Sequence, residues 1–341
     1  MTHPAPAERR PRVVLALRPD LEPRLFDPAL RASLAEVAEV APVVLSDFGA
    51  PDAARTLAGA EVLLTCWGAP RIDAAALAAA PGLRAVVHAA GSVRGIVTDA
   101  CWERGIAVSS ATAANARPVA EYTLAMILLA GKKVLEFREN YREERRAHFW
   151  QVERPDVGNY GRTVGIVGAS RIGRQLIRLL AHHDVRVLVY DPYLGAEDAR
   201  ELGVDLVGLD ELCAASDVVT VHAPELPSTR DLIDRERLAL MRDGATLINT
   251  ARGSLVNTPA LLDELATGRI HAVLDVTEPD VLPADSPLFT LPNVVLTPHI
   301  AGSLGTELHR MAASAIAEIG RYARGEAFAF PVLRQEIDRT A

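Results

Sequence analysis

The middle of the chain contains the sequence TVGIVGASRIG at residues 163–173. Its first five residues predict a buried strand, and the apolar spacing from Ile172 to His182 predicts a helix. Between them, Gly168 and Gly173 occupy the first and third glycine positions of a GxGxxG loop, while Ser170 occupies the middle one. Such a loop places a pyrophosphate at a helix N-terminus, and the serine hydroxyl can itself bond a phosphate. An ordinary tight strand–helix turn is the alternative.

The next predicted strand, Val185–Tyr190, leads directly into Asp191, which stands 18 residues after Gly173. An acid at this point of a dinucleotide-binding unit accepts hydrogen bonds from the adenosine ribose hydroxyls. Its charge repels the extra phosphate of NADP, so we expect NAD as the cofactor. A solvent-facing turn aspartate remains the alternative.

Strands and helices alternate on both sides of this loop. Before it, strands are predicted at Arg12–Leu17, Val62–Thr65 and Leu83–His88, with helices around Pro28–Val40 and Asp73–Ala80. After it, further strands are predicted at Val218–His222, Thr246–Asn249, Ala272–Leu274 and Val294–Leu296. The alternation predicts an α/β fold with two Rossmann-like, doubly wound parallel-sheet domains.

The connection between the two series is a long apolar helix over Arg117–Leu129, which we expect to start at Pro118. A charged helical segment, Lys132–Arg146, follows it, and an amphipathic helix over Gly305–Arg324 remains at the end. We therefore expect a discontinuous, flavodoxin-like substrate domain at 1–112 and 304–341. The cofactor domain is expected at 113–303.

Composition excludes several classes of protein. The 341 residues carry a formal net charge of −8, which disfavours a nucleic-acid or anionic-membrane partner. Cys66, Cys101 and Cys213 are too far apart for a zinc motif or a disulfide framework and indicate a reducing compartment. Met1–Arg12 is expected to be a disordered leader, and no apolar run reaches membrane-spanning length. A cytoplasmic location follows.

Three segments, each after a short predicted strand, carry the residues for chemistry. They are Asn249–Gly253, Leu274–Asp280 and Thr297–Gly302. Because strand ends meet at the carboxyl edge of a parallel sheet, these segments offer an arginine, carboxylates and a histidine together. Arginine orients a substrate carboxylate and polarises its carbonyl, while a carboxylate-paired histidine supplies or takes the hydroxyl proton. These are the groups that reversible hydride transfer to a ketone requires.

With these motifs the sequence closely resembles the D-isomer-specific 2-hydroxyacid dehydrogenases over about Val62–Gly302. The segments that carry the resemblance are Asn115–Glu121, Val221–Pro224 with Thr229-Arg230, Thr250–Gly253, Asp275 and Pro298–Gly302. The resemblance implies that Arg252, Asp280 and His299 are catalytic, that Asp275 lies near the nicotinamide, and that the chain forms a homodimer through the cofactor domain. Together with the glycine loop, it assigns cofactor contacts to Gly168, Ser170, Arg171, Ile172, Gly173, Asp191, His222, Ala223, Pro224, Thr229, Thr250, Ala251, Arg252, Asp275, His299 and Gly302.

Two departures from the family pattern bear on function. The family usually places Glu where this chain has Asp280, and Glu278 lies two residues earlier. We expect Asp280 to be the partner of His299. The loop at 90–95 is one residue shorter than the family's carboxylate-binding loop and carries Arg94. We expect substrate contacts from Trp67, Gly91, Ser92, Arg94 and Arg252, and no metal.

The predicted function is an NAD-dependent 2-hydroxyacid dehydrogenase acting on a small 2-keto or D-2-hydroxy acid. One alternative is an NAD(H)-sensing binding protein on the same fold. Another is an inactive homologue in which Asp280 and Ser170 mark lost function. The motifs do not name the acid, because substrates differ widely within one fold.

Overall fold

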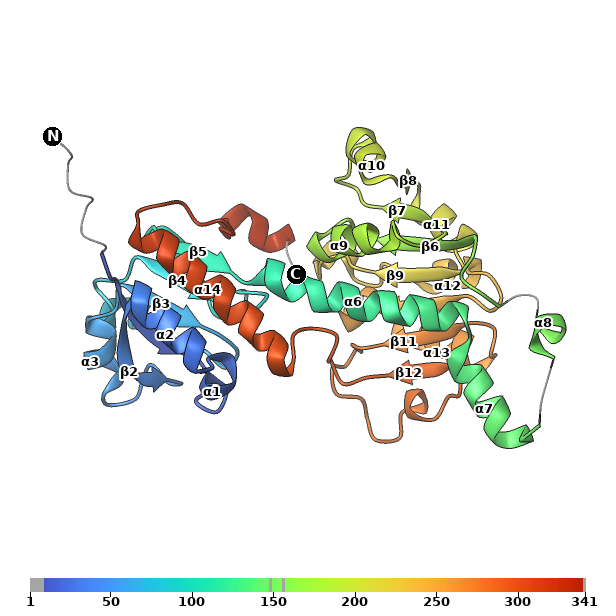
Figure 1. Cartoon of the computed structure of the whole chain (residues 1–341), viewed down its shortest axis with the longest axis horizontal. Helices are drawn as coiled ribbons and strands as arrows, with labels where there is room; N and C mark the ends of the chain where they lie inside the picture. The colour runs from blue at the N-terminus through green and yellow to red at the C-terminus, as the bar shows by residue number, and fades with distance from the viewer. Residues whose placement is uncertain (1–8, 147–148, 155–156, 340–341) are drawn as a thin grey trace. The chain divides into compact units, whose positions relative to one another are not determined.

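The computed structural model describes residues 9–146, 149–154 and 157–339. Its chain divides into two compact units, Met1–Asn115 with Ser303–Thr340, and Ala116–Gly302. Each unit is built on one sheet, and every strand pairing within both sheets is parallel (Figure 1). The predicted α/β architecture with two parallel sheets is confirmed.

The first unit contains a five-stranded sheet in the order β2-β1-β3-β4-β5, which is the flavodoxin-like order. Its strands are β1 Arg12–Ala16, β2 Glu39–Leu45, β3 Val62–Thr65, β4 Ala85–His88 and β5 Ala107–Ser110. Its helices are α1 Glu22–Leu25, α2 Pro28–Val37, α3 Ala53–Ala58, α4 Ala74–Ala79, α5 Asp99–Glu103 and α14 Leu308–Ala323, with short 3-10 turns at Gly305–Glu307 and Arg334–Arg339. Side chains of α2 and α14 share one core cluster with the sheet, and those of α3, α4 and α5 share another.

The second unit contains a seven-stranded sheet in the order β12-β11-β10-β9-β6-β7-β8. Its strands are β6 Arg162–Val167, β7 Val185–Tyr190, β8 Asp205–Leu206, β9 Val218–Val221, β10 Thr246–Asn249, β11 His271–Leu274 and β12 Val294–Leu296. Its helices are α6 Thr112–Gly131, which begins four residues before this unit, then α7 Val134–Glu144, α8 Trp150–Glu153, α9 Arg171–Leu180, α10 Ala196–Leu202, α11 Leu209–Ala215, α12 Arg235–Leu240 and α13 Thr258–Ala266. Three 3-10 turns cover Pro227–Thr229, Gly253–Leu255 and Pro287–Phe289.

This second sheet is covered on both faces. Side chains of α6, α9 and α10 pack with one face, and those of α11, α12 and α13 pack with the other. The chain order reverses between β6 and β9, and doubly wound sheets bind ligands at such a switch point, beyond the carboxyl ends of the strands.

Two sequence-based boundaries were wrong. The long helix α6 begins at Thr112, so Pro118 lies inside it and not at its start. Proline removes a single backbone donor, and the alanine-rich residues before it continue the helix upstream. The helix predicted to run to Val40 ends at Val37, and β2 begins at Glu39.

Candidate active site

The glycine loop connects β6 to α9 in the second unit. Gly168 has a φ of +102°, and a Cβ placed on it would lie 2.7 Å from the backbone nitrogen of Ala223. The loop therefore runs directly against the chain that leaves β9, and only glycine fits there. Ser170 has an ordinary extended conformation and caps α9, since its hydroxyl oxygen accepts a hydrogen bond from the Gly173 N–H at 3.3 Å. Serine thus replaces the middle glycine without strain.

Asp191 lies at the carboxyl end of β7, next to this loop. Its carboxylate accepts hydrogen bonds from the Ala169 N–H at 2.7 Å and from the Tyr193 N–H at 2.8 Å. An ionised carboxylate has about four acceptor positions, so these two bonds leave room for ribose hydroxyls. Asp191 therefore braces the glycine loop in addition to any contact with a nucleotide.

His222 follows β9 and is fully buried. Its Nε2 pairs with the Thr220 hydroxyl at 3.0 Å, while its Nδ1 has no partner among the described residues. Burial lowers the pKa of His222 to about 3, so the ring is neutral near pH 7. Further along this loop, the Thr229 hydroxyl donates to the Pro224 carbonyl at 2.6 Å and accepts from the Leu226 N–H at 2.9 Å. The loop is thereby fixed at both ends.

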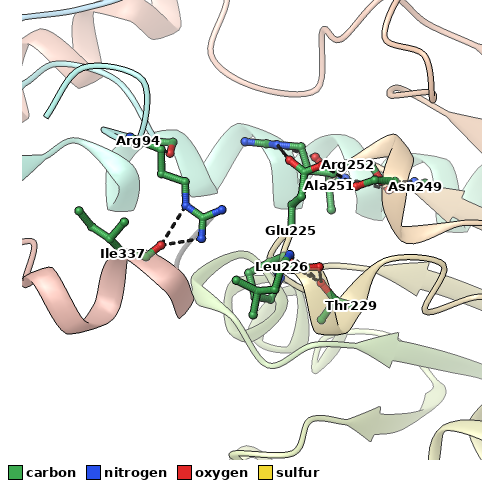
Figure 2. Close-up of polar contacts among 11 residues, drawn as sticks. Arg94, Glu225, Leu226, Thr229, Asn249, Ala251, Arg252 and Ile337 are labelled. Atoms are coloured by element: carbon green, nitrogen blue, oxygen red, sulfur yellow. Dashed lines mark hydrogen bonds and ion pairs between the residues drawn. The ribbon is translucent and has the colours of Figure 1, made fainter. Parts of the chain in front are cut away.

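Arg252 follows β10, and its backbone is held by Asn249. The Asn249 amide donates to the Arg252 carbonyl at 2.8 Å and accepts from the Ala251 N–H at 3.1 Å. The guanidinium donates from Nη1 to the Ala251 carbonyl at 2.6 Å, and the side chain is 34% exposed. Its Nε lies 3.9 Å from a carboxylate oxygen of Glu225. Both side chains are labelled in Figure 2. A cation with exposed donors therefore stands at the edge of the sheet.

Asp275, at the end of β11, organises the loop that carries His299. Its carboxylate is only 1% exposed and accepts from the Ile300 N–H and the Ala301 N–H, both at 2.8 Å. It also accepts from the Thr297 hydroxyl at 2.7 Å. His299 lies between these residues with a φ of +56°, and its side chain is exposed. The buried carboxylate thus fixes a backbone that presents the imidazole to solvent.

Tyr122 on α6 extends this network, because its hydroxyl lies 2.8 Å from the Thr297 hydroxyl. Burial is the largest of the causes that raise the pKa of Tyr122, with Asp275 adding to the rise, while the bond to Thr297 opposes it. The tyrosine therefore stays protonated near pH 7, and its hydroxyl helps to hold the loop after β12 through Thr297.

The acidic loop after β11 lies against the arginine loop. A Cβ on Gly253 would come within 2.0 Å of the Thr277 backbone, so the two loops are in direct contact. Asp280 and Glu278 are both exposed, and Glu278 is 3.4 Å from the Arg230 guanidinium. Across the part of the chain that the structure describes, the His299 ring forms no hydrogen bond or ion pair with either carboxylate.

The substrate residues expected from the first unit lie after β3 and β4. Trp67 is exposed, and the Gly91 carbonyl accepts from the Thr112 hydroxyl at 3.0 Å. Arg94 is engaged within its own unit: its Nε and Nη2 donate to the Ile337 carbonyl at 2.9 and 2.6 Å (Figure 2). This contact comes from a segment 243 residues away in sequence, and no local pattern indicates it.

Sequence reasoning assigned no role to three residues of the site. Glu225 belongs to no motif that we used, although its place directly after the VHAP segment was a usable signal. Tyr122 and Thr297 support the histidine loop through contacts between distant segments, which sequence spacing does not reveal. Among the described residues, no three His, Cys, Asp or Glu side chains are placed to hold a metal ion. None of the described helices is both long and apolar enough to cross a membrane.

The strand order of the second sheet, the glycine loop at Gly168 and the acid Asp191 at the end of β7 together define a Rossmann-type dinucleotide-binding domain. The chain belongs to the D-isomer specific 2-hydroxyacid dehydrogenase family, whose NAD binding domain matches residues 124–301. It is 38% identical over 280 residues to a D-3-phosphoglycerate dehydrogenase of Mycobacterium leprae, covering 80% of this chain and 51% of that protein. It is 35% identical to a glyoxylate reductase of Korarchaeum cryptofilum, covering 75% of this chain and 77% of the other.

Among solved structures, a phosphoglycerate oxidoreductase from Rhizobium etli is 25% identical with a TM-score of 0.80. The match covers 96% of this chain and all of that one. The chain spans about half the length of the D-3-phosphoglycerate dehydrogenases that it matches, 51% for the Mycobacterium leprae protein.

Proposed function

We propose that this protein is an NAD-dependent dehydrogenase that interconverts a small 2-keto acid and the matching D-2-hydroxy acid. The observation that carries the proposal is the grouping within one unit: the Arg252, Asp275 and His299 loops follow β10, β11 and β12 of the same sheet that carries the glycine loop. Arginine, carboxylate and imidazole at one sheet edge are the groups that ketone reduction requires.

The residues at the glycine loop fit a bound dinucleotide. The first turn of α9 offers backbone N–H groups to a pyrophosphate, and the Gly168 loop leaves no side chain in the way. The hydroxyl proton of Ser170 stays available, because the capping bond uses only the oxygen of that hydroxyl. Bound NAD supplies the hydride acceptor or donor. We propose that the other cofactor contacts named above line the same edge.

Arg252 and His299 act on the substrate in this proposal. The Arg252 guanidinium binds the carboxylate and the C2 carbonyl oxygen, which orients the ketone and polarises it. The His299 imidazolium donates a proton to that oxygen in reduction, and the neutral ring takes it back in oxidation. We propose Asp280 as the carboxylate that orients the ring in the loaded protein, since the Arg230 contact occupies Glu278.

The proposal extends to the rest of the chain. We propose residues 113–303 as the cofactor domain and residues 1–112 with 304–341 as the substrate domain, with Trp67, Gly91, Ser92 and Arg94 as its substrate contacts. We also propose a cytoplasmic homodimer formed through the cofactor domain. Dimer formation is supported by exposed apolar side chains in this domain, those of Leu129, Val134 and Leu135. The cytoplasmic location is supported by the three cysteines, which are buried and unbridged. Light scattering during size-exclusion chromatography measures the oligomeric state.

The test is NADH oxidation, followed by absorbance, with glyoxylate, hydroxypyruvate, pyruvate, phenylpyruvate and phosphohydroxypyruvate. We expect turnover with at least one acid. Arg252→Ala should lose most of it, about a hundredfold or more in kcat/KM, while NADH binding stays nearly unchanged. Tight NADH binding without turnover on any acid would instead support the NAD(H)-sensing or the inactive alternative. Turnover like the parent's in Arg252→Ala would overturn the role of the arginine.

A further inference from the structure

The proposed substrate arginine has an acidic neighbour that the glycine, arginine and histidine motifs do not include. One carboxylate oxygen of Glu225 lies 3.9 Å from Arg252 Nε, and the other accepts from the Ser254 hydroxyl at 2.6 Å. Figure 2 shows the Glu225 side chain directed toward Arg252 from the neighbouring loop. The Thr229 bonds to the Pro224 carbonyl and the Leu226 N–H fix the residues on either side of Glu225. The carboxylate is therefore held in place by both loops.

This neighbour changes the charge that a substrate meets. The pair of Arg252 and Glu225 has no net charge, although the guanidinium still presents Nη donors to one carboxylate. In the acidic loop beside it, Arg230 faces Glu278 at 3.4 Å, and the exposed Asp280 adds a further negative charge. A second anionic group on the substrate would add repulsion from Glu225, which is 49% exposed at this edge.

We propose that Glu225 selects 2-keto acids with a single negative charge and discriminates against those with a second anionic group, such as a phosphate ester or a second carboxylate. This inference rests on the proposed function. It separates the chain from the relatives that are named for a phosphorylated substrate. Glu225 acts here as a specificity-determining residue, and it leaves the proton transfer to His299.

The test compares hydroxypyruvate with phosphohydroxypyruvate, which differ only by the phosphate, in the parent and in Glu225→Gln. The glutamine keeps an oxygen for the Ser254 hydroxyl and removes only the charge. A unit charge about 6 Å from a phosphate that carries nearly two charges, at a water-like effective dielectric constant of about 80, changes binding about tenfold. We therefore expect the parent to prefer hydroxypyruvate. In Glu225→Gln the ratio of kcat/KM values should shift about tenfold toward the phosphate ester, mainly through KM.

Two controls isolate the charge. Glu211→Gln removes the charge of an exposed acid on α11, and its ratio should equal the parent's. Ser254→Ala removes the hydrogen bond to Glu225 and keeps the charge, so most of the discrimination should persist. An unchanged ratio in Glu225→Gln, or a parent that prefers the phosphate ester, overturns the proposal.

A binding experiment keeps the inference testable without turnover. Oxamate and oxalate have nearly the same shape and carry one and two negative charges, and calorimetry measures both against the NADH-loaded protein. Glu225→Gln should strengthen oxalate binding relative to oxamate by several-fold. If the parent turns over none of the acids but this shift appears, the proposed function fails and the charge selection holds. If neither anion binds, or the shift is absent, the inference is wrong.

Discussion

Replacing Asp275 with asparagine should destabilise the second unit and disable the histidine loop together. The carboxylate is buried and accepts three hydrogen bonds, from the Thr297 hydroxyl and from the Ile300 and Ala301 N–H groups, at 2.7 to 2.8 Å. An asparagine keeps one acceptor oxygen and turns the other into a donor. At least one buried N–H or hydroxyl then faces an NH₂ group, and the remaining bonds lose their charge assistance.

The size of the effect follows from these contacts. A hydrogen bond to a charged acceptor contributes about 1.5–3 kcal/mol, and a buried donor left without an acceptor costs about 1–3 kcal/mol. We therefore expect Asp275→Asn to lower the free energy of unfolding by about 3 kcal/mol. For a unit of this size that corresponds to a fall in Tm of about 10 °C. The loss of kcat should be larger than the loss of NADH affinity, because the loop that moves carries His299.

Thermal unfolding and single-turnover reduction measure the two effects. Asp280→Asn is the matched control, since it makes the same chemical change at an exposed carboxylate. Its Tm should stay within about 1 °C of the parent's. A Tm for Asp275→Asn that also stays within this range would contradict the expected loss of stability, because a carboxylate with three buried donors cannot be neutralised without cost. A large fall in Tm with normal kcat would separate the loop from catalysis.

Three further predictions follow from the site. Asp191→Ala should narrow the preference for NADH over NADPH about tenfold in kcat/KM, whereas equal efficiency of the parent with both cofactors would contradict the assignment. In Asp280→Asn the rate of reduction should begin to fall at a lower pH than in the parent, whereas Glu278→Gln should leave the pH–rate profile unchanged. The reverse result in the two profiles would make Glu278 the partner of His299. Burial lowers the pKa of His222 to about 3, against about 6.5 in an unfolded chain, so the unfolded state binds the proton first. As the pH falls below about 6.5, this histidine alone should decrease the free energy of unfolding by about 1.4 kcal/mol per pH unit. When the free energy of unfolding is measured by urea titration at several pH values, it should fall less steeply with decreasing pH in His222→Gln than in the parent.

The α/β architecture was predictable because most central strands are short apolar runs between helical patterns. The edge strand β12 keeps that signal, but the edge strands β8 and β2 do not give it clearly. β8, at Asp205–Leu206, is a short exposed edge strand without an apolar run. β2 is also an edge strand, and it contains Pro42, which is tolerated where one side of the strand faces no partner. Its apolar residues continue the spacing of the preceding helix, so the pattern predicts a helix that runs three residues past Val37.

The positions of Arg252 and His299 were predictable, because each lies in a segment that follows a short apolar strand. The contacts that hold these residues in place were not predictable, because they join segments that are distant in the sequence. Asp275 was expected beside the nicotinamide, and the structure shows its carboxylate bonded to Thr297 and to two backbone groups up to 26 residues later. The approach of Glu225 to Arg252 similarly depends on how the loops after β9 and β10 meet.

The proposed function requires that this chain transfers a hydride to C2 of a 2-keto acid to form the D-hydroxy acid. The most direct test is reduction of the best acid in the panel other than glyoxylate, whose product has no D or L isomer, with NADH that carries deuterium at the transferred C4 position. The product is then analysed by chiral chromatography and mass spectrometry. We expect the D isomer with one deuterium at C2. An L product, a product without deuterium, or no product from any acid would contradict it.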